Sequence, residues 1–216
     1  MSKANLNLAD IRKDYKKKSL SEEETTYKPL DQFSQWLNEA ITANVCEPTA
    51  MNFSTVSKDC RPTSRILLLK EVNEKGLVFF TNYQSRKGKE LEENPAGCIT
   101  FFWPELERQV RIEGFVEKIS EEESEKYFKS RPFLSRVGAT ISPQSTEISK
   151  EVLEKKFEEA QNTYSEENLQ KPEHWGGFCL IPDYFEFWQG RPGRLHDRIC
   201  YKSSGENEWV KARLAP

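Results

Sequence analysis

The chain has 216 residues, of which 36% are hydrophobic, 31% charged and 12% aromatic, enough for one large domain or two small ones. Its formal charge of -3, from 32 Lys plus Arg and 35 Asp plus Glu, excludes a nucleic-acid partner recognised through overall basicity. The longest apolar runs, such as Ile66–Leu69, are far shorter than the roughly 18 residues needed to span a bilayer, which excludes a membrane-spanning helix.

The first 28 residues differ from the rest in composition. Residues 1–28 are polar and dense in charge with little periodicity, so they predict an arm that is mobile until something orders it. The arm lacks the apolar central stretch of a secretory signal, and we therefore expect a cytoplasmic protein. Residues 29–216 are expected to form one domain. The five cysteines never form a CxxC pair and there are only two histidines, which predicts reduced thiols and no metal site.

Residues 29–119 predict a helix followed by a series of strands. Asp31 is expected to cap a helix with an apolar stripe formed by Phe33, Trp36, Leu37, Ala40 and Ile41. Short apolar or alternating runs, separated by turn residues, predict strands at 50–57, 63–71, 77–82, 97–103 and 108–119. A short helix is expected at Arg86–Glu93, because the proline at 95 cannot continue it. Five strands in one series favour a barrel, whose closure removes exposed sheet edges.

Residues 120–216 predict two helices and then more strands. Ser120 followed by Glu123 is a capping-box pattern that starts one helix, and the apolar spacing between Ser149 and Tyr164 predicts the second. Strands are expected at 177–181, 184–189, 197–202 and 208–213, with a turn at residues 203–206. Together these elements predict one α+β domain with a barrel core.

The sequence contains none of the standard motifs for phosphate loops, dinucleotide binding, zinc proteases or serine hydrolases. The remaining candidates for binding or catalytic residues are clusters of Arg, Lys and His. The segment at 194–198, RLHDR, is the most unusual of them. On an extended strand Arg194, His196 and Arg198 would share a face, where a phosphate or an electron-rich flavin ring would relieve their repulsion. A solvated basic edge strand is the alternative.

Two strands carry further candidates. Trp188 places a large flat indole near Gly190, a residue that permits close approach or an unusual backbone angle. Core packing is the more usual role of a tryptophan, and a platform for a ligand is the alternative. Gln109 and Arg111 share a strand face. The amide of Gln109 is suited either to a polar ring edge or to a cross-strand hydrogen bond.

Cations flank two other segments. Arg65 and Lys70 bound an apolar strand and, five residues apart, would face opposite sides and bind different groups. Residues 85–89, SRKGK, precede a predicted helix, where free backbone N–H groups and cations together suit a phosphate. The alternative for residues 85–89 is a basic turn exposed to solvent, which has the same sequence pattern.

At these residues the chain resembles the pyridoxine 5'-phosphate oxidase family, also called pyridoxamine 5'-phosphate oxidase, which comprises flavin enzymes of vitamin B6 metabolism. The resemblance runs in order from about residue 11 to residue 216. The matching segments are RILLLK at 65–70, FFTNYQSRKGKELEENP at 79–95, ERQVRIEG at 107–114, YFKSRP at 127–132, VGATISPQS at 137–145, WGGF at 175–178, FWQG at 187–190, RLHDR at 194–198 and the C-terminal RLAP.

The resemblance implies a fold and a set of contacts. It implies an antiparallel, Greek-key-like split β-barrel with flanking helices, in a homodimer that holds FMN between its subunits. The implied FMN contacts are Arg65, Ile66, Leu67, Leu68, Phe80, Thr81, Arg86, Lys87, Gln109, Gln144, Ser145, Trp188 and Arg198. The implied substrate contacts are Lys70, Tyr127, Arg131, Ser135, Arg194 and His196, with Arg12 and Tyr15 of the arm closing over the substrate as a lid.

The reaction implied by the resemblance is oxidation of pyridoxine 5'-phosphate or pyridoxamine 5'-phosphate to pyridoxal 5'-phosphate. A hydride would pass from C4′ to N5 of FMN, and O2 would reoxidise the flavin to give H2O2. Arg194 and His196 are the expected catalytic residues that position C4′, and His196 is also a candidate for assisting proton loss. The alternatives are a non-catalytic flavin or pyridoxal-phosphate-binding protein and a split-barrel flavin reductase.

Overall fold

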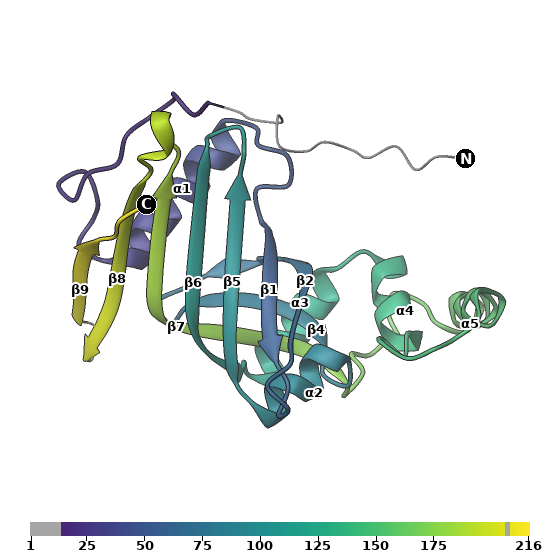
Figure 1. Cartoon of the computed structure of the whole chain (residues 1–216). Coiled ribbons are helices and arrows are strands. Elements are labelled where there is room, and N and C mark those ends of the chain that lie inside the picture. Colours follow the sequence, from purple (N-terminus) through teal and green to yellow (C-terminus); the bar gives the residue numbers. More distant parts are fainter. Residues whose placement is uncertain (1–13, 206–207) are drawn as a thin grey trace, which may run out of the picture.

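The computed structural model describes residues 14–205 and 208–216, which form one curled antiparallel sheet with helices around it (Figure 1). The strands are β1 (Ala50–Val56), β2 (Pro62–Leu68), β3 (Glu71–Val72), β4 (Leu77–Asn82), β5 (Ala96–Trp103), β6 (Arg108–Lys118), β7 (Trp175–Gln189), β8 (Asp197–Gly205) and β9 (Glu208–Arg213). They follow the order β2-β1-β5-β6-β7-β4-β3, while β8 pairs with β7 and β9 with β8. β1 pairs with β5 and not with β4, so the chain crosses over as in a Greek key. The predicted antiparallel split barrel of the α+β class is confirmed.

Strand β7 links the two halves of the barrel. Its first part pairs with β4 and its last part with β8, while β6 follows it over most of its length. The register shifts at Glu113 and Gly114, which leaves Asp183 as an extra residue, and such bulges bend a strand. The strands predicted at 177–181 and 184–189 are therefore one bent strand, because the bulge absorbs the break in alternation.

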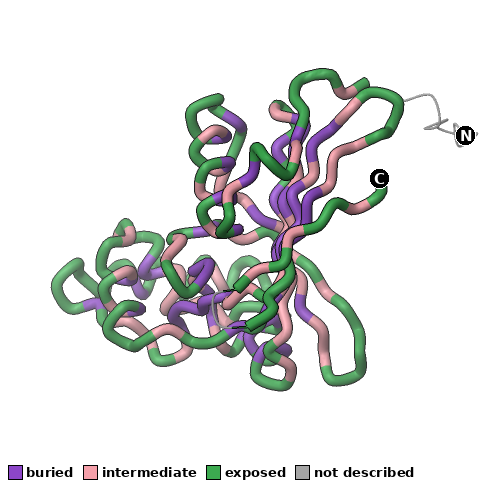
Figure 2. Tube along the Cα trace, turned by 90° about the vertical axis from the view of Figure 1, so that its left-hand side faces the viewer, coloured by how far each residue is buried: buried purple, intermediate pink, exposed green. Residues whose placement is uncertain are grey.

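The inner face of the sheet holds an aromatic core. Its fully buried members include Phe53, Phe79, Phe101, Trp103 and Phe187. Helix α1 (Pro29–Thr42) covers this face with Phe33 and Trp36, and buried stretches run along the strands (Figure 2). α1 begins at Pro29, a residue favoured at the first helical position, so Asp31 lies in the first turn and does not cap the helix as predicted.

The remaining helices lie at the end of the sheet away from β8 and β9 (Figure 1). They are α2 (Arg86–Glu93), α3 (Glu121–Ser130), α4 (Phe133–Ile141) and α5 (Lys150–Thr163). α3 begins with the predicted capping box of Ser120 and Glu123. α4 is absent from the prediction because Pro132 at its N-cap offers no side-chain acceptor. A second, smaller core joins α3, α4 and α5 to the sheet through Phe128, Val137, Ala160, Leu169 and Trp175, whereas Leu91 of α2 belongs to the main core.

Residues 14–28 lie against the barrel. Leu20 is buried, and the hydroxyl of Tyr201 donates a hydrogen bond to the carbonyl of Thr26 at 2.7 Å. Arg12 lies outside the described residues. The division between an arm of residues 1–28 and a domain of residues 29–216 therefore stays a prediction. The role of the arm as a lid over the substrate also stays a prediction.

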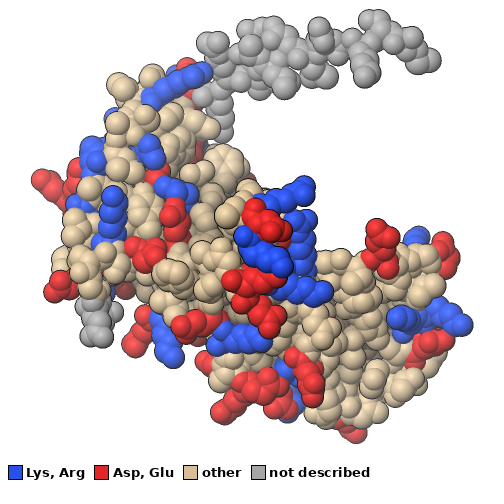
Figure 3. Space-filling model, turned by 60° about the horizontal axis from the view of Figure 1, so that its bottom comes forward, with Lys and Arg blue, Asp and Glu red and all other residues tan. Residues whose placement is uncertain are grey.

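Charges of both signs share the surface. On the face shown in Figure 3, Lys and Arg side chains are interspersed with Asp and Glu. Exposed ion pairs such as that between Lys129 and Glu125 contribute little to stability. Among residues 14–205 and 208–216, no helix is long and apolar enough to cross a membrane.

Candidate active site

Two arginines and two threonines surround the buried carboxylate of Glu90 on α2. Arg65 Nη2 lies 3.4 Å from Glu90 Oε2, and Arg86 Nε lies 2.9 Å from Glu90 Oε1. The hydroxyls of Thr55 and Thr63 donate to the same carboxylate at 2.5 and 2.7 Å. Burial raises the pKa of Glu90, but the hydrogen bonds from these threonines and from Arg86 outweigh it and bring the pKa down to about 2.

Lys87 adds a third cation beside this group. Its ammonium donates to Thr81 Oγ1 at 2.8 Å, to Ser85 Oγ at 3.1 Å and to Gln144 Oε1 at 3.3 Å, all neutral oxygens. The side chain is buried and forms no ion pair within the described part of the chain. Burial, followed by the positive charge of Arg65, lowers the pKa of Lys87 to about 8. Two of the three cations pair with the single carboxylate of Glu90 and the third has no ion pair among the described residues, so the excess positive charge suits a dianion such as a phosphate ester. We call Arg65, Arg86 and Lys87 the cation cluster.

Replacing Glu90 with glutamine is expected to destabilise the fold in a pH-dependent way. The folded-state pKa of about 2 lies below the ordinary 4.5, so the carboxylate stabilises the fold above about pH 5 and loses this effect as the pH falls toward 2. The shift corresponds to about 3 kcal/mol at neutral pH. Urea unfolding of wild type and E90Q should therefore differ most near neutral pH and converge in acid. Equal free energies of unfolding at neutral pH would contradict this role of Glu90.

Helix α3 brings two candidate residues to the start of β7. The ring of Tyr127 stacks on Phe80, with centroids 3.9 Å apart, and the guanidinium carbon of Arg131 lies 4.8 Å from the ring centroid of Trp175. Nη1 of Arg131 is buried and has no hydrogen-bond partner among the described residues. Burial also lowers the pKa of Arg131. A buried cationic donor without a partner is costly, and an anionic ligand would satisfy it.

Three other predicted residues are exposed. Lys70 lies beyond the end of β2 at Leu68, so the argument that it faces the strand side opposite Arg65 does not apply. Ser135 lies on α4, and Ser145 adopts a left-handed backbone with φ of 71° directly after Gln144. All three side chains are accessible to a ligand.

The outer face of the sheet carries a second group of candidates. Gln109 on β6 lies opposite Trp188 on β7, which lies opposite Arg198 on β8. Arg198 Nε donates to Glu186 Oε1 at 2.9 Å, and Arg111 Nη2 donates to Glu186 Oε2 at 2.8 Å. Gln109 and Arg111 share a strand face as predicted. This hydrogen-bonded network fixes Arg198 beside the indole of Trp188.

The prediction that Arg194, His196 and Arg198 share one strand face is wrong. β8 begins directly after His196, and Pro192–Arg194 form a 3-10 turn. Gly193 and Arg194 have φ of 64° and 61°, and these left-handed angles break the alternation of an extended strand. Only Arg198 belongs to the strand, while Arg194 is exposed on the turn.

His196 nevertheless lies beside Trp188, with ring centroids 4.7 Å apart. The backbone N–H of Arg191 donates to His196 Nδ1 at 3.1 Å, which places the proton of the neutral imidazole on Nε2. The ring of Tyr15 lies 5.5 Å from Trp188 and 5.8 Å from His196. The arm and these two candidates therefore form one aromatic cluster.

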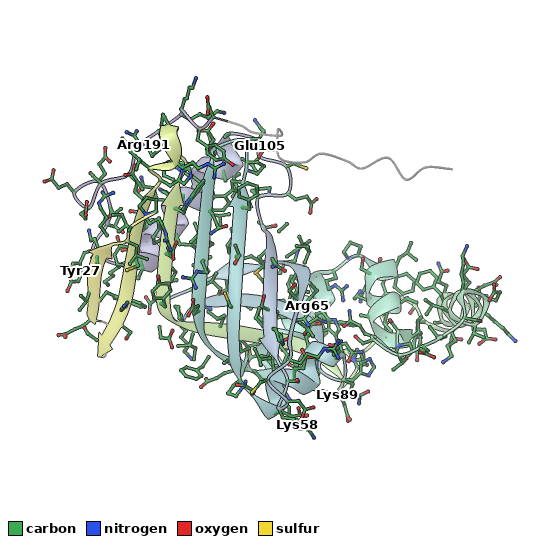
Figure 4. All side chains as sticks on the ribbon, in the orientation of Figure 1. Tyr27, Lys58, Arg65, Lys89, Glu105 and Arg191 are labelled. Carbon is green, nitrogen blue, oxygen red and sulfur yellow. The ribbon has the colours of Figure 1, made fainter. Side chains whose placement is uncertain are left out.

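Within one chain the predicted residues form two separate groups. One group lies near Gly177 of β7, which pairs with Phe80, the residue on which Tyr127 stacks. The other group includes Trp188, near the opposite end of β7, with Gln109 and Arg198. The strand between them is about 36 Å long at about 3.3 Å per residue. Figure 4 shows Arg65 near α2, whereas Arg191 and Glu105 lie at the opposite, upper end of the sheet.

Glu90 and Glu186, which organise the two groups, are absent from the sequence-based predictions. Glu90 follows Arg86 by four residues on a helix, a spacing that favours an ion pair. Glu186 and Trp188 are two residues apart on β7 and therefore share a strand face. These spacings are the signals that identify the two carboxylates as partners of the predicted cations.

Comparisons with known proteins agree with this fold. A family model described as pyridoxamine 5'-phosphate oxidase matches residues 37–164, and one described as the pyridoxine 5'-phosphate oxidase C-terminal dimerisation region matches residues 175–216. A pyridoxine/pyridoxamine 5'-phosphate oxidase from Actinobacillus succinogenes is 56% identical, over 98% of this chain and 100% of its own length. One from Chromobacterium violaceum is 54% identical, over 98% of this chain and 99% of its own length.

Two solved structures have a fold similar to that of this chain. PhzG from Burkholderia lata 383, in complex with tetrahydrophenazine-1-carboxylic acid, is 30% identical with a TM-score of 0.84, over 90% of this chain and 95% of its own. A second structure is that of a pyridoxamine 5'-phosphate oxidase-related, FMN binding protein from Nostoc punctiforme, with a TM-score of 0.72 over 87% of this chain and 97% of its own. Its sequence identity is 17%, so this similarity supports the fold alone. The family models and the full-length relatives show that the chain belongs to the pyridoxine/pyridoxamine 5'-phosphate oxidase family of oxidoreductases.

Proposed function

We propose that the protein is an FMN-dependent oxidase that converts pyridoxine 5'-phosphate and pyridoxamine 5'-phosphate to pyridoxal 5'-phosphate. With the alcohol, dioxygen takes up two electrons and two protons and becomes hydrogen peroxide. With the amine, water is also consumed and ammonia is released. The observation that carries the proposal is a pair of cationic sites in a chain of this family, one at Lys87 and one at Arg131, each suited to a phosphate.

The cation cluster fits the phosphate of FMN. This inference rests on Lys87, a buried ammonium that meets only neutral oxygens among the described residues, and on the excess of cations over Glu90. FMN bound there supplies a hydride acceptor that dioxygen can reoxidise. The residues that would hold it with the cluster are Ile66, Leu67, Leu68, Phe80, Thr81, Gln144 and Ser145, together with Gln109, Trp188 and Arg198 at the other end of β7.

The unpartnered Nη1 of Arg131 fits a second phosphate, that of the substrate. A guanidinium recognises phosphate through parallel hydrogen bonds, so Arg131 favours the phosphorylated forms of vitamin B6 over the free vitamin. Lys70, Tyr127 and Ser135 would add ammonium and hydroxyl donors around the same phosphate.

Arg194 and His196 would orient C4′, the substrate carbon that is oxidised. Because Nδ1 of His196 accepts from the backbone of Arg191, its Nε2–H is a hydrogen-bond donor. This tautomer supports orientation of the substrate by His196 more than proton abstraction. Tyr15 would cover the substrate and exclude water, together with Arg12, which lies outside the described residues.

We infer that each active site is shared between two copies of the chain in a homodimer. The two groups lie toward opposite ends of β7, so a ligand that contacts both would take one group from each copy. The outer face of the sheet exposes Ile66, Phe102 and Phe115 at 66, 53 and 56%, and burial of this apolar area favours association. The match of residues 175–216 to a dimerisation region supports the same arrangement.

Oxygen uptake tests the proposed function. Purified protein loaded with FMN should consume oxygen in air and form pyridoxal 5'-phosphate and peroxide in equal amounts from either substrate. A non-catalytic flavin or pyridoxal-phosphate-binding protein would bind these molecules without oxygen uptake, and a flavin reductase would pass electrons to another acceptor without forming the aldehyde. Either of these results would reject the oxidase.

A further inference from the structure

The carboxylate of Glu107 joins the N-terminal arm to the rim of the sheet. Glu107 lies in the turn between β5 and β6 and is 3% exposed. Its Oε2 accepts the backbone N–H of Lys16 at 2.8 Å and that of Lys17 at 3.0 Å. Successive N–H groups that converge on one anionic oxygen form a strong, directional contact. The arm is therefore held at a defined point.

The backbone of Glu107 has a conformation that favours glycine. Its φ is 55°, in the left-handed region, which costs a residue with a side chain about 1 kcal/mol. The carbonyl of Glu107 accepts the N–H of Gly190 at 2.7 Å and the side-chain amide of Gln189 at 3.2 Å. Backbone strain of this kind occurs at functional sites, and here it lies where the arm, the turn and the end of β7 meet.

The same contacts fix the position of Tyr15. Tyr15 directly precedes the two residues that Glu107 binds, and its ring packs against Trp188 and His196 in edge-to-face contacts. A Cβ atom added at Gly190 would lie 2.7 Å from Cγ of Tyr15 and 3.1 Å from Cβ of Glu107. The space above Gly190 is therefore filled by Tyr15, and the carboxylate of Glu107 holds the backbone that carries this ring.

We propose that Glu107 is a positioning residue that latches the arm, so that Tyr15 covers the substrate beside Trp188 and His196. In this role Glu107 acts through the backbone of Lys16 and Lys17, and no contact with substrate or FMN is required. The inference rests on the proposed function, in which Tyr15 and His196 contact the substrate. Loss of the latch would let substrate leave more easily, and would raise KM more than it lowers kcat.

Two variants of Glu107 separate the latch from folding. Glu107→Gly removes the carboxylate but supplies the residue that this backbone favours, so the fold is expected to keep its stability. Glu107→Gln keeps an amide oxygen that can accept both N–H groups. Glu105→Ala is the matched control, because Glu105 is exposed in the same turn and only its carbonyl contacts the arm.

Trypsin reports on the latch directly, since residues 16–18 are all lysines beside the contact. In the FMN-loaded protein, E107G should be cleaved at these lysines at least about tenfold faster than wild type. Its KM for pyridoxine 5'-phosphate should rise about tenfold with kcat within about twofold. E107Q should stay within about threefold of wild type in both measurements, and E105A should match wild type.

Unchanged cleavage of E107G would overturn the latch. Faster cleavage with unchanged KM and kcat would overturn the positioning role, because the arm would then be released without effect on substrate. The proteolysis result does not depend on turnover. Failure of the proposed function would appear separately, as a lack of oxygen uptake by the wild-type protein.

Discussion

FMN binding is expected to weaken by about 10²- to 10³-fold when Lys87 is replaced by methionine. The ammonium is buried and its three donors meet only neutral oxygens among the described residues, so a bound phosphate would gain a charge-assisted contact shielded from solvent. Loss of such a contact costs about 3–4 kcal/mol when the partner charge stays buried, and each 1.4 kcal/mol is tenfold in affinity. Quenching of flavin fluorescence during titration of FMN-free protein measures the effect.

Lys89→Met is the matched control, since Lys89 lies on the same helix but is exposed, and K89M should bind FMN as wild type does. The pH dependence adds a second readout. Because the pKa of Lys87 in the ligand-free protein is about 8, the ammonium is present below pH 8 and is lost above it. FMN affinity of wild type should therefore fall above about pH 8, whereas that of K87M should stay flat. Equal affinities of K87M and wild type at neutral pH would remove Lys87 from the FMN site.

Arg131→Met is expected to abolish most of the preference for phosphorylated substrate. The KM for pyridoxine 5'-phosphate should rise by about 10²- to 10³-fold, because the guanidinium would form paired, charge-assisted bonds to the phosphate. Turnover of free pyridoxine should be unaffected, since it offers no phosphate. The fold should remain at least as stable, because the change removes a buried donor that has no partner among the described residues.

Lys129→Met serves as the control for Arg131, because Lys129 is exposed in the last turn of α3, two residues before the C-cap position that Arg131 occupies. FMN affinity should be the same for R131M, K129M and wild type. An R131M variant that keeps its preference for pyridoxine 5'-phosphate over pyridoxine would show that the substrate phosphate binds elsewhere.

The sequence predicts the sheet of this protein better than its loops. Alternating strands, Pro95 after α2 and the capping box at Ser120 depend on local chemistry, and the structure confirms them. The continuity of β7 depends on a bulge that only strand pairing reveals. α4 has no local start signal, because its N-cap is proline.

The candidate site shows the same division between local and long-range information. The cations at 86 and 87 lie at the start of a helix as predicted, and the spacing of Arg86 and Glu90 signals one ion pair. The contacts of Glu90 with Thr55, Thr63 and Arg65 form only when β1, β2 and α2 come together. The strand predicted from residue 197 onward is present as β8, but residues 194–196 do not extend it, because positive φ angles at Gly193 and Arg194 turn the chain before β8 begins. Glu107 is important only because residues about ninety positions earlier in the chain fold back onto it.

The sharing of each active site between two chains is tested most directly by a hybrid dimer. Co-expression of Arg131→Met and Arg194→Ala chains with different affinity tags allows the mixed dimer to be isolated. If each site takes Arg131 from one chain and Arg194 from the other, the hybrid has one intact site and one doubly altered site. It should then show about half of wild-type activity, whereas each parent variant alone should lose about 10²-fold or more. A hybrid no more active than its parents would contradict the shared site and place both residues in a site built from a single chain.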